Sequence, residues 1–266
     1  MPTKNVAITL TNQGYLPIVK DNITFYGGSQ MWFSDKNRYS KDFILHNYGC
    51  GTIATADMFL YLARQNNALQ TPVTQMAIKD KSEIGYSDYD IYVRAINDKY
   101  TKTKRIIAVL GTTVANAINT YSGQYGLGLK AAWKLSLSYY DMLEMIEEML
   151  GKDIPVILSI GPNTPNLWGK KGIPFYELRE IDYQETDNTD PEAAKPYYYK
   201  AVKQDINGHF VTVTGVIKDD VTGRIMLRIS SWGKQYYINY EEYRDYIDSA
   251  GGTFTSSIVY VTKKFD

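Results

Sequence analysis

The sequence predicts an α+β protein with a helical N-terminal lobe and a β-rich C-terminal lobe. Two observations support this: apolar residues recur at helical spacing through much of the first half, and short runs of alternating apolar and polar residues fill the end of the chain. A chain of 266 residues can bury one large core or two lobes around a cleft. We expect a single domain, 1–266, with a helical lobe over about 34–153 and a β-rich remainder, 1–33 and 154–266.

The expected elements of the first half follow from local patterns. Residues 5–33 alternate and break at Gly14 and at Asp21-Asn22, which indicates short strands joined by turns. Residues 34–41 are expected to form a polar loop. Helical spacing, with capping residues Ser87-Asp88 and Ser138 before two of the segments, predicts helices over 50–66, 89–99, 104–121 and 139–150. The segment 126–135 is expected to be extended.

The second half begins with a buried-strand signal at 155–161. A long irregular stretch rich in proline follows over 162–196, and loops of that length usually serve a function or cross the surface. Further strands are expected over 209–216, 224–231, 235–240 and 257–262, with one helix over 240–249 among them. The two halves should meet in a groove, which is the natural place for a site.

The composition excludes several classes of function. Lys plus Arg equals Asp plus Glu at 29 each, so no global positive field gathers nucleic acid or anionic membrane. No apolar run approaches the length of a membrane span, so we expect no membrane insertion. We expect a cytoplasmic protein, or an exported one whose signal is absent from this chain. The 24 tyrosines are expected mainly on amphipathic faces, or otherwise in an aromatic cleft for peptide or sugar.

The single cysteine, Cys50, and the two histidines, His46 and His209, define the possible thiol chemistry. One cysteine excludes an intrachain disulfide and a multi-cysteine metal site, and we expect no metal and no cofactor. Cys50 stands at the start of an expected helix, where backbone N–H groups and the helix dipole favour a thiolate. His209 opens a strand and is the expected base, whereas His46 is expected to hydrogen-bond in the approach loop.

Three short motifs resemble the papain-like cysteine peptidase superfamily. Gly49-Cys50-Gly51 before an apolar helix resembles its cysteine segment and looks closest to bacterial double-glycine peptidases of the bacteriocin-processing type. His209, six residues before a glycine, resembles its histidine strand. Ser230-Ser231-Trp232-Gly233 resembles its Asn-Ser-Trp-Gly segment, and the order along the chain is that of the superfamily.

The resemblance implies a papain-like fold, in which the cysteine helix packs against a C-terminal antiparallel sheet or barrel. It implies a hydrolase of peptide or amide bonds, with a peptide or protein as substrate, Cys50 as nucleophile and His209 as base and then acid. Ser230 or Ser231 stands where the superfamily has its orienting asparagine, and Asp205 and Asn207 are further acceptors near the base. The residues expected to contact substrate are Gly49, Gly51, Gly208 and Trp232.

The oxyanion donor departs from the superfamily pattern. A glutamine is expected six residues before the cysteine, and this chain has Ile44 there. Asn47, whose amide carries two N–H donors, is the nearest chemical substitute and is expected to act with the Cys50 N–H.

Other functions remain open at this stage. On the same fold, an amine could intercept the thioester and give acyl transfer, or a catalytically retired domain could bind peptide or carbohydrate in a tyrosine-rich groove. A transglutaminase-like arrangement ranks lower, because it normally has an aspartate where this chain has Ser230-Ser231.

Overall fold

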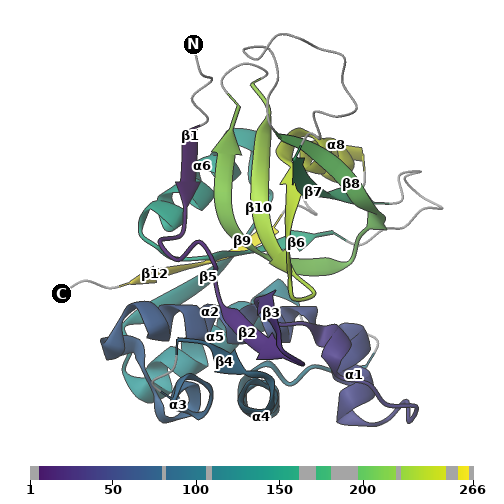
Figure 1. The fold of residues 1–266 in the computed structure, drawn as a ribbon. Helices are drawn as coiled ribbons and strands as arrows, with labels where there is room; N and C mark the ends of the chain where they lie inside the picture. Colours follow the sequence, from purple (N-terminus) through teal and green to yellow (C-terminus); the bar gives the residue numbers. More distant parts are fainter. Residues whose placement is uncertain are drawn as a thin grey trace.

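The computed structural model describes residues 6–79, 82–105, 110–161, 172–180, 197–219, 223–249 and 257–263. The α+β class predicted from the sequence is confirmed, since helices and a large antiparallel sheet make up the chain (Figure 1). No helix within these residues combines enough length and apolar character to cross a membrane.

Helices dominate the first half of the chain. The α-helices are α1 (Lys41–Tyr48), α2 (Cys50–Gln65), α3 (Pro72–Ile78), α4 (Tyr86–Ile96), α5 (Gly111–Tyr125), α6 (Tyr139–Gly151) and, later, α8 (Tyr240–Ser249). Shorter helical segments are η1 (Gln30–Trp32), η2 (Asn67–Leu69) and η3 (Asn97–Thr101).

Within the part of the chain that the structure describes, most strands belong to one sheet of nine. The strands are β1 (Val6–Thr9), β2 (Pro17–Lys20), β3 (Ile23–Tyr26), β4 (Ile84–Gly85), β5 (Leu129–Leu135), β6 (Val156–Ile160), β7 (Ile173–Glu180), β8 (Tyr197–Ile206), β9 (His209–Lys218), β10 (Ile225–Ser231), β11 (Lys234–Asn239) and β12 (Ser257–Lys263). The order is β5-β12-β6-β9-β10-β11-β7-β8, with β1 paired to β9, and β3-β2-β4 form a separate small sheet.

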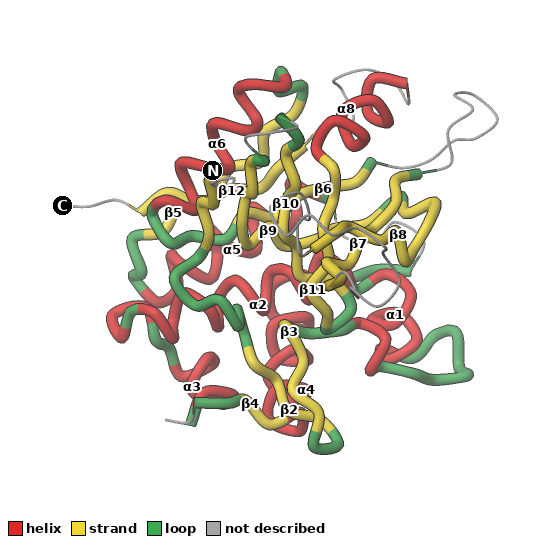
Figure 2. The backbone as a smooth tube through the Cα atoms, turned by 45° about the horizontal axis from the view of Figure 1, so that its top comes forward, coloured by secondary structure: helices red, strands yellow, loops and turns green. Residues whose placement is uncertain are grey.

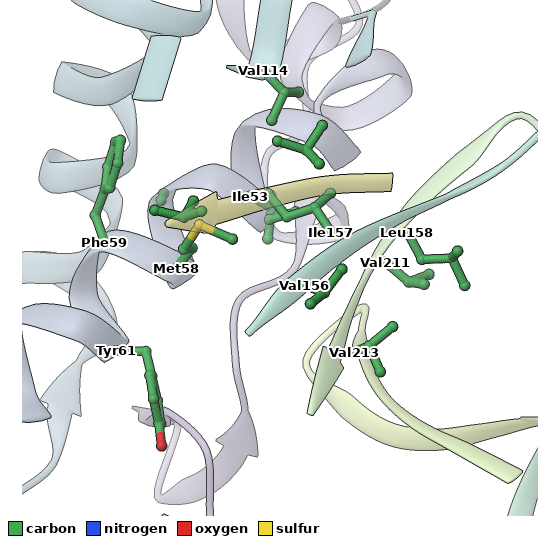
Figure 3. Packing of buried hydrophobic residues seen from close by; sticks show 14 of the residues in the cluster. Ile53, Met58, Phe59, Tyr61, Val114, Val156, Ile157, Leu158, Val211 and Val213 are labelled. Carbon is green, nitrogen blue, oxygen red and sulfur yellow. The ribbon is translucent and has the colours of Figure 1, made fainter. Parts of the chain in front are cut away.

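Helix α2 forms the centre of the packing. Every residue from Cys50 to Ala63 is buried, because α2 contacts β9 on one side and α3, α4 and α5 on others (Figure 2). The helix predicted over 50–66 is therefore confirmed, and it is buried along most of its length. Figure 3 shows Ile53 and Met58 of α2 in the same apolar core as Ile157 and Val211 of the sheet.

Two elements of the expected helical lobe pack with the sheet. Strand β5 pairs with β12 along its whole length and forms one edge of the sheet. Helix α6 packs against β1, β9 and β12. In the second half of the chain, α8 packs against β7, β10 and β11. The large sheet is thus assembled from segments spread along almost the whole chain.

Several local predictions agree with the structure. The Asp21-Asn22 turn joins β2 to β3, with positive φ at both residues. Ser138 caps α6, and its hydroxyl accepts the Asp141 N–H at 3.1 Å. The predicted limits of α2, α8, β6 and β9 to β12 agree with the structure to within a few residues.

Several predictions were wrong. Helix α1 begins at Lys41, the last residue of the expected polar loop, and α1, α3 and β7 were not expected. Helix α4 begins at Tyr86, so Ser87 and Asp88 lie in its first turn and do not cap it. Helix α5 begins at Gly111, later than expected. Residues 106–109 of that predicted helix lie outside the described residues, as do 162–171 and 181–196 of the predicted irregular stretch.

Candidate functional site

Cys50 lies at the first position of α2, directly after the end of α1. Gly49 joins the two helices, and its N–H donates to the Leu45 carbonyl at 2.9 Å. A Cβ on Gly49 would lie 2.2 Å from that carbonyl oxygen, so only glycine permits this close approach. The junction places the Cys50 thiol and the free N–H groups of the first helical turn together.

Cys50 lines a small cavity between α2 and the sheet. The cavity leaves about 20 Å³ for the centre of a water molecule, which is room for roughly one water. Its walls come from α2, the start of β9, the end of β10 and the segment after β3. They are formed by Gly28, Gln30, Cys50, Ile53, Ala54, Asp57, His209, Phe210, Thr212, Ser230, Ser231 and Trp232. The cavity therefore brings together Cys50 and His209, as the sequence predicted.

His209 is held on two sides. Its Nε2 lies 2.8 Å from the Ser231 hydroxyl, and its ring stacks on Trp232 with 4.4 Å between ring centroids and 15° between planes. With Nε2 engaged by Ser231, Nδ1 is the ring nitrogen left for a thiol proton. The ring is thus fixed in position and orientation.

Burial controls the charge of both groups. It lowers the pKa of His209 to about 3, and it raises the pKa of Cys50. Three backbone N–H groups lower the thiol pKa, those of Phe210, Gly51 and Cys50. The effect of desolvation is larger, so the net shift is upward. Burial therefore opposes the stabilised thiolate expected from the sequence, because it favours the neutral form of both groups.

The turn between β10 and β11 places Trp232 over His209. Trp232 and Gly233 both have positive φ, 49° and 74°, as in a two-residue type I′ hairpin turn. The tip docks on the segment after β3, since the Gly233 N–H donates to the Gly28 carbonyl at 2.9 Å and the Tyr26 N–H donates to the Gly233 carbonyl at 2.8 Å. These backbone contacts fix the turn that carries Trp232 against the segment around Gly28.

Asp57 is a buried carboxyl in the same cavity. It lies two helical turns after Cys50, on the same face of α2. The Gly28 N–H donates to its Oδ2 at 2.7 Å, and the Tyr89 hydroxyl donates to its Oδ1 at 2.6 Å. Burial raises its pKa to about 7, although both hydrogen bonds act to lower it. No motif or spacing in the sequence pointed to a role for this group.

Of the two serines at the end of β10, Ser231 contacts the base. The Ser230 hydroxyl instead donates to the Tyr26 carbonyl at 2.7 Å. The two side chains diverge because adjacent residues of a strand point to opposite faces. Of the two serines expected near the base, Ser231 is therefore the one in contact with His209, while Asp205 and Asn207 do not line the cavity.

Asn47 lines a second, wider pocket and not the cavity that contains Cys50. It is exposed in α1, its amide donates to the Phe43 carbonyl at 2.8 Å, and it is absent from the cavity wall. His46 also lies outside the cavity, with Nδ1 at 2.5 Å from the Phe33 carbonyl. That position agrees with the supporting role expected for His46 and does not support the catalytic role expected for Asn47.

The glycines expected to contact substrate have backbone roles. Gly49, Gly51 and Gly208 are all absent from the cavity wall, whereas Trp232 is part of it. Gly208 is exposed with a φ of 56°, and its N–H donates to the Gly161 carbonyl at 3.0 Å just before β9.

Gln30 is a cavity residue that sequence reasoning missed. It opens η1, and its Nε2 donates to the His46 carbonyl at 2.8 Å, which leaves a second amide N–H. A glutamine was expected at a fixed distance before Cys50, but α1 lies between the two residues here. One sequence feature could have indicated that this segment approaches the site closely. It is the pair Gly27-Gly28, which lies directly after a strand and just before the capping residue Ser29.

The comparisons with known proteins do not assign this site. No protein-family model matches the chain. A search of curated proteins finds no match either.

Proposed function

We propose that the chain is a papain-like cysteine hydrolase of peptide or amide bonds. One observation carries the proposal: Cys50 at a helix start and His209, held by Ser231 and Trp232, line the same cavity. A thiol, an imidazole and a third group that orients the imidazole form the arrangement of nucleophilic catalysis.

In this proposal the reaction starts from a neutral thiol and a neutral imidazole. His209 Nδ1 takes the Cys50 proton as the sulfur attacks the substrate carbonyl, and Nε2–H donates to Ser231. The developing oxyanion lies against the Cys50 N–H and the second amide N–H of Gln30. His209 then gives its proton to the leaving amine, and a water activated by the same ring hydrolyses the thioester. In this scheme Gln30 takes the role expected for Asn47, and Ser231 is the serine that orients His209.

A second candidate is a domain that binds peptide without cleaving it. The observation in its favour is the burial of both reactive groups, which disfavours the charged pair and leaves room for about one water beside them. Acyl transfer to an amine would use the same residues as hydrolysis. Mass spectrometry of a peptide pool, with and without an added amine, separates cleavage, transfer and binding alone.

The thiol itself supplies the main test, because Cys50 is the single cysteine. We expect iodoacetamide to alkylate the protein at pH 7 at least about tenfold faster than the His209→Gln variant, since only the former has a base for the thiol proton. His46→Gln is the matched control and should react as the parent does. Equal rates for the parent and His209→Gln would contradict the proposal.

A further inference from the structure

A larger groove opens beside the Cys50 cavity. It has a volume of about 530 Å³ and shares Gln30 and Trp232 with the cavity. Tyr236 and the exposed Met31 contribute further apolar surface to it. A peptide bound at Cys50 would therefore continue across Trp232 into this groove.

The groove carries unbalanced positive charge. Lys203 and Lys234 both line it and are exposed, while none of the described residues that line it is Asp or Glu. Among the residues that the structure describes, neither lysine has an ion pair. The negative charge of the nearby Glu177 helps to raise the pKa of Tyr236, but Glu177 itself forms an ion pair with Arg179. Two ammonium groups are thus available to a ligand.

The sheet fixes both lysines near the site. Lys203 of β8 pairs with Phe175 of β7, whose ring lies 5.6 Å from that of Trp232, and the Lys203 ammonium lies 4.9 Å over the Trp232 ring. Lys234 pairs directly with Ser231, the residue that contacts His209. Residues paired across a sheet share a face, so both charges face the groove.

The position of the groove also indicates which part of a substrate enters it. His209 gives its proton to the leaving amine in the proposed reaction, so the leaving group lies beside that ring. Trp232 covers the ring and also lines the groove. The leaving-group side of the substrate is therefore the part that reaches Lys203 and Lys234.

We propose that the substrate is an acidic peptide whose carboxylates lie on the leaving-group side of the cleaved bond and contact Lys203 and Lys234. This inference rests on the proposed function for the direction of the peptide, but the charge preference can be measured without turnover. Exposed ion pairs contribute up to about fivefold each in affinity, and salt weakens them.

The test uses decapeptides that carry Glu, Gln or Lys at one position on either side of the cleaved bond. We expect Glu on the leaving-group side to raise kcat/KM about five- to tenfold over Gln, and about 0.5 M NaCl to remove most of this preference. The double variant Lys203→Glu with Lys234→Glu should reverse this preference and cleave the Lys peptide with a higher kcat/KM than the Glu peptide. The control, Lys130→Glu with Lys134→Glu on β5, makes the same charge change outside the groove and should keep the preference for Glu.

Binding of the same peptides to Cys50→Ala separates the two proposals. Tighter binding of the Glu peptide than of its Gln twin, lost in Cys50→Ala with Lys203→Glu and Lys234→Glu, supports the groove even if the parent cleaves nothing. Cleavage with equal preference for Glu, Gln and Lys would retain the hydrolase and overturn the acidic-peptide proposal. A Glu preference confined to the acyl side would also overturn it.

Discussion

The carboxyl of Asp57 accepts the backbone N–H of Gly28 at 2.7 Å, and this contact ties the Cys50 helix to the segment that ends in Gln30. The same segment is held from the other side by the β10–β11 turn, through the hydrogen bond from the Gly233 N–H to the Gly28 carbonyl. Gln30, Cys50 and Trp232 are therefore positioned by one connected set of contacts. A change at Asp57 or Gly28 should affect both stability and the site.

Asp57→Asn should change how stability depends on pH. The folded state keeps the Asp57 proton up to a pKa of about 7, whereas the unfolded chain loses it near 3.8, so the free energy of unfolding falls as pH rises between these values. At about 1.4 kcal/mol for each of roughly three pKa units, the loss reaches about 4 kcal/mol at most. Asparagine has no such proton and should not show this loss.

Urea denaturation of the parent and Asp57→Asn from pH 4 to pH 8 measures this effect. At each pH the free energy of unfolding of the parent is compared with that of Asp57→Asn, because the His209 titration contributes equally to both proteins and cancels in the difference. The asparagine side chain would keep an acceptor for the Gly28 N–H and can donate to the Tyr89 oxygen. The prediction is contradicted if this difference in free energy stays constant from pH 4 to pH 8, because folded Asp57 would then be ionised throughout that range.

Gly28→Ala should destabilise the protein by about 1–3 kcal/mol, as overpacking does. A Cβ at Gly28 would lie 1.7 Å from the Tyr89 hydroxyl oxygen and 2.5 Å from the carbon that bears it. Tyr89→Phe removes the first of these clashes, so the two substitutions together should cost less than the sum of their separate costs. Thermal unfolding of the four proteins in this cycle measures the coupling, and strict additivity would contradict the packing described.

Adjacent serines should give different results when each is changed to alanine. Ser231→Ala removes the partner of the buried His209 Nε2, so it should cost about 1–3 kcal/mol of stability and, unlike Ser230→Ala, should also lower kcat and the Cys50 alkylation rate. Ser230→Ala leaves the half-buried Tyr26 carbonyl without this donor and should cost about 1–3 kcal/mol of stability. Unfolding and alkylation measured on both variants test the assignment, which the reverse pattern would contradict.

Local patterns predicted much of the fold because their signals lie within the elements themselves. Helix α6 has its Ser138 cap, α2 has apolar residues at helical spacing, and the Asp21-Asn22 turn has residues that tolerate positive φ. The capping box of Thr71 with Thr74 was an equally local signal for α3 that the apolar pattern alone did not reveal.

The site was predictable only in part, for a physical reason. Cys50 and His209 were found because their chemistry is scarce in this chain. Gln30 was missed because its position depends on a contact between segments, the hydrogen bond from the Gly28 N–H to Asp57, and not on its spacing from Cys50. The choice between Ser230 and Ser231 required the strand register, since a shift of one residue exchanges the two faces.

Gln30→Ala should lower kcat for a cleaved peptide by about 10²–10³ with little change in KM, because the amide meets the oxyanion mainly in the transition state. Gln30→Glu keeps the side-chain length but replaces the N–H donor with a carboxylate, and should be at least as slow. Steady-state kinetics of both variants give the two constants separately. A rise in KM at unchanged kcat would assign Gln30 to ground-state binding instead.

Trp232→Gly should raise the pKa of His209 from about 3 toward its ordinary value of 6.5. Burial alone lowers this pKa, and the stacked Trp232 ring supplies cover on one face of the imidazole. Glycine suits the φ of 49° at this turn position, so the hairpin should keep its geometry, whereas alanine there would be strained. The chain has only two histidines, so NMR titration of the ring protons resolves His209, with His46 as an internal reference.

Because a His pKa below its unfolded value makes stability fall as pH drops below about 6.5, Trp232→Gly should also lose less stability between about pH 6.5 and pH 4 than the parent. A His209 pKa that stays near 3 in this variant would place the cause of its desolvation in the surrounding sheet and not in the indole.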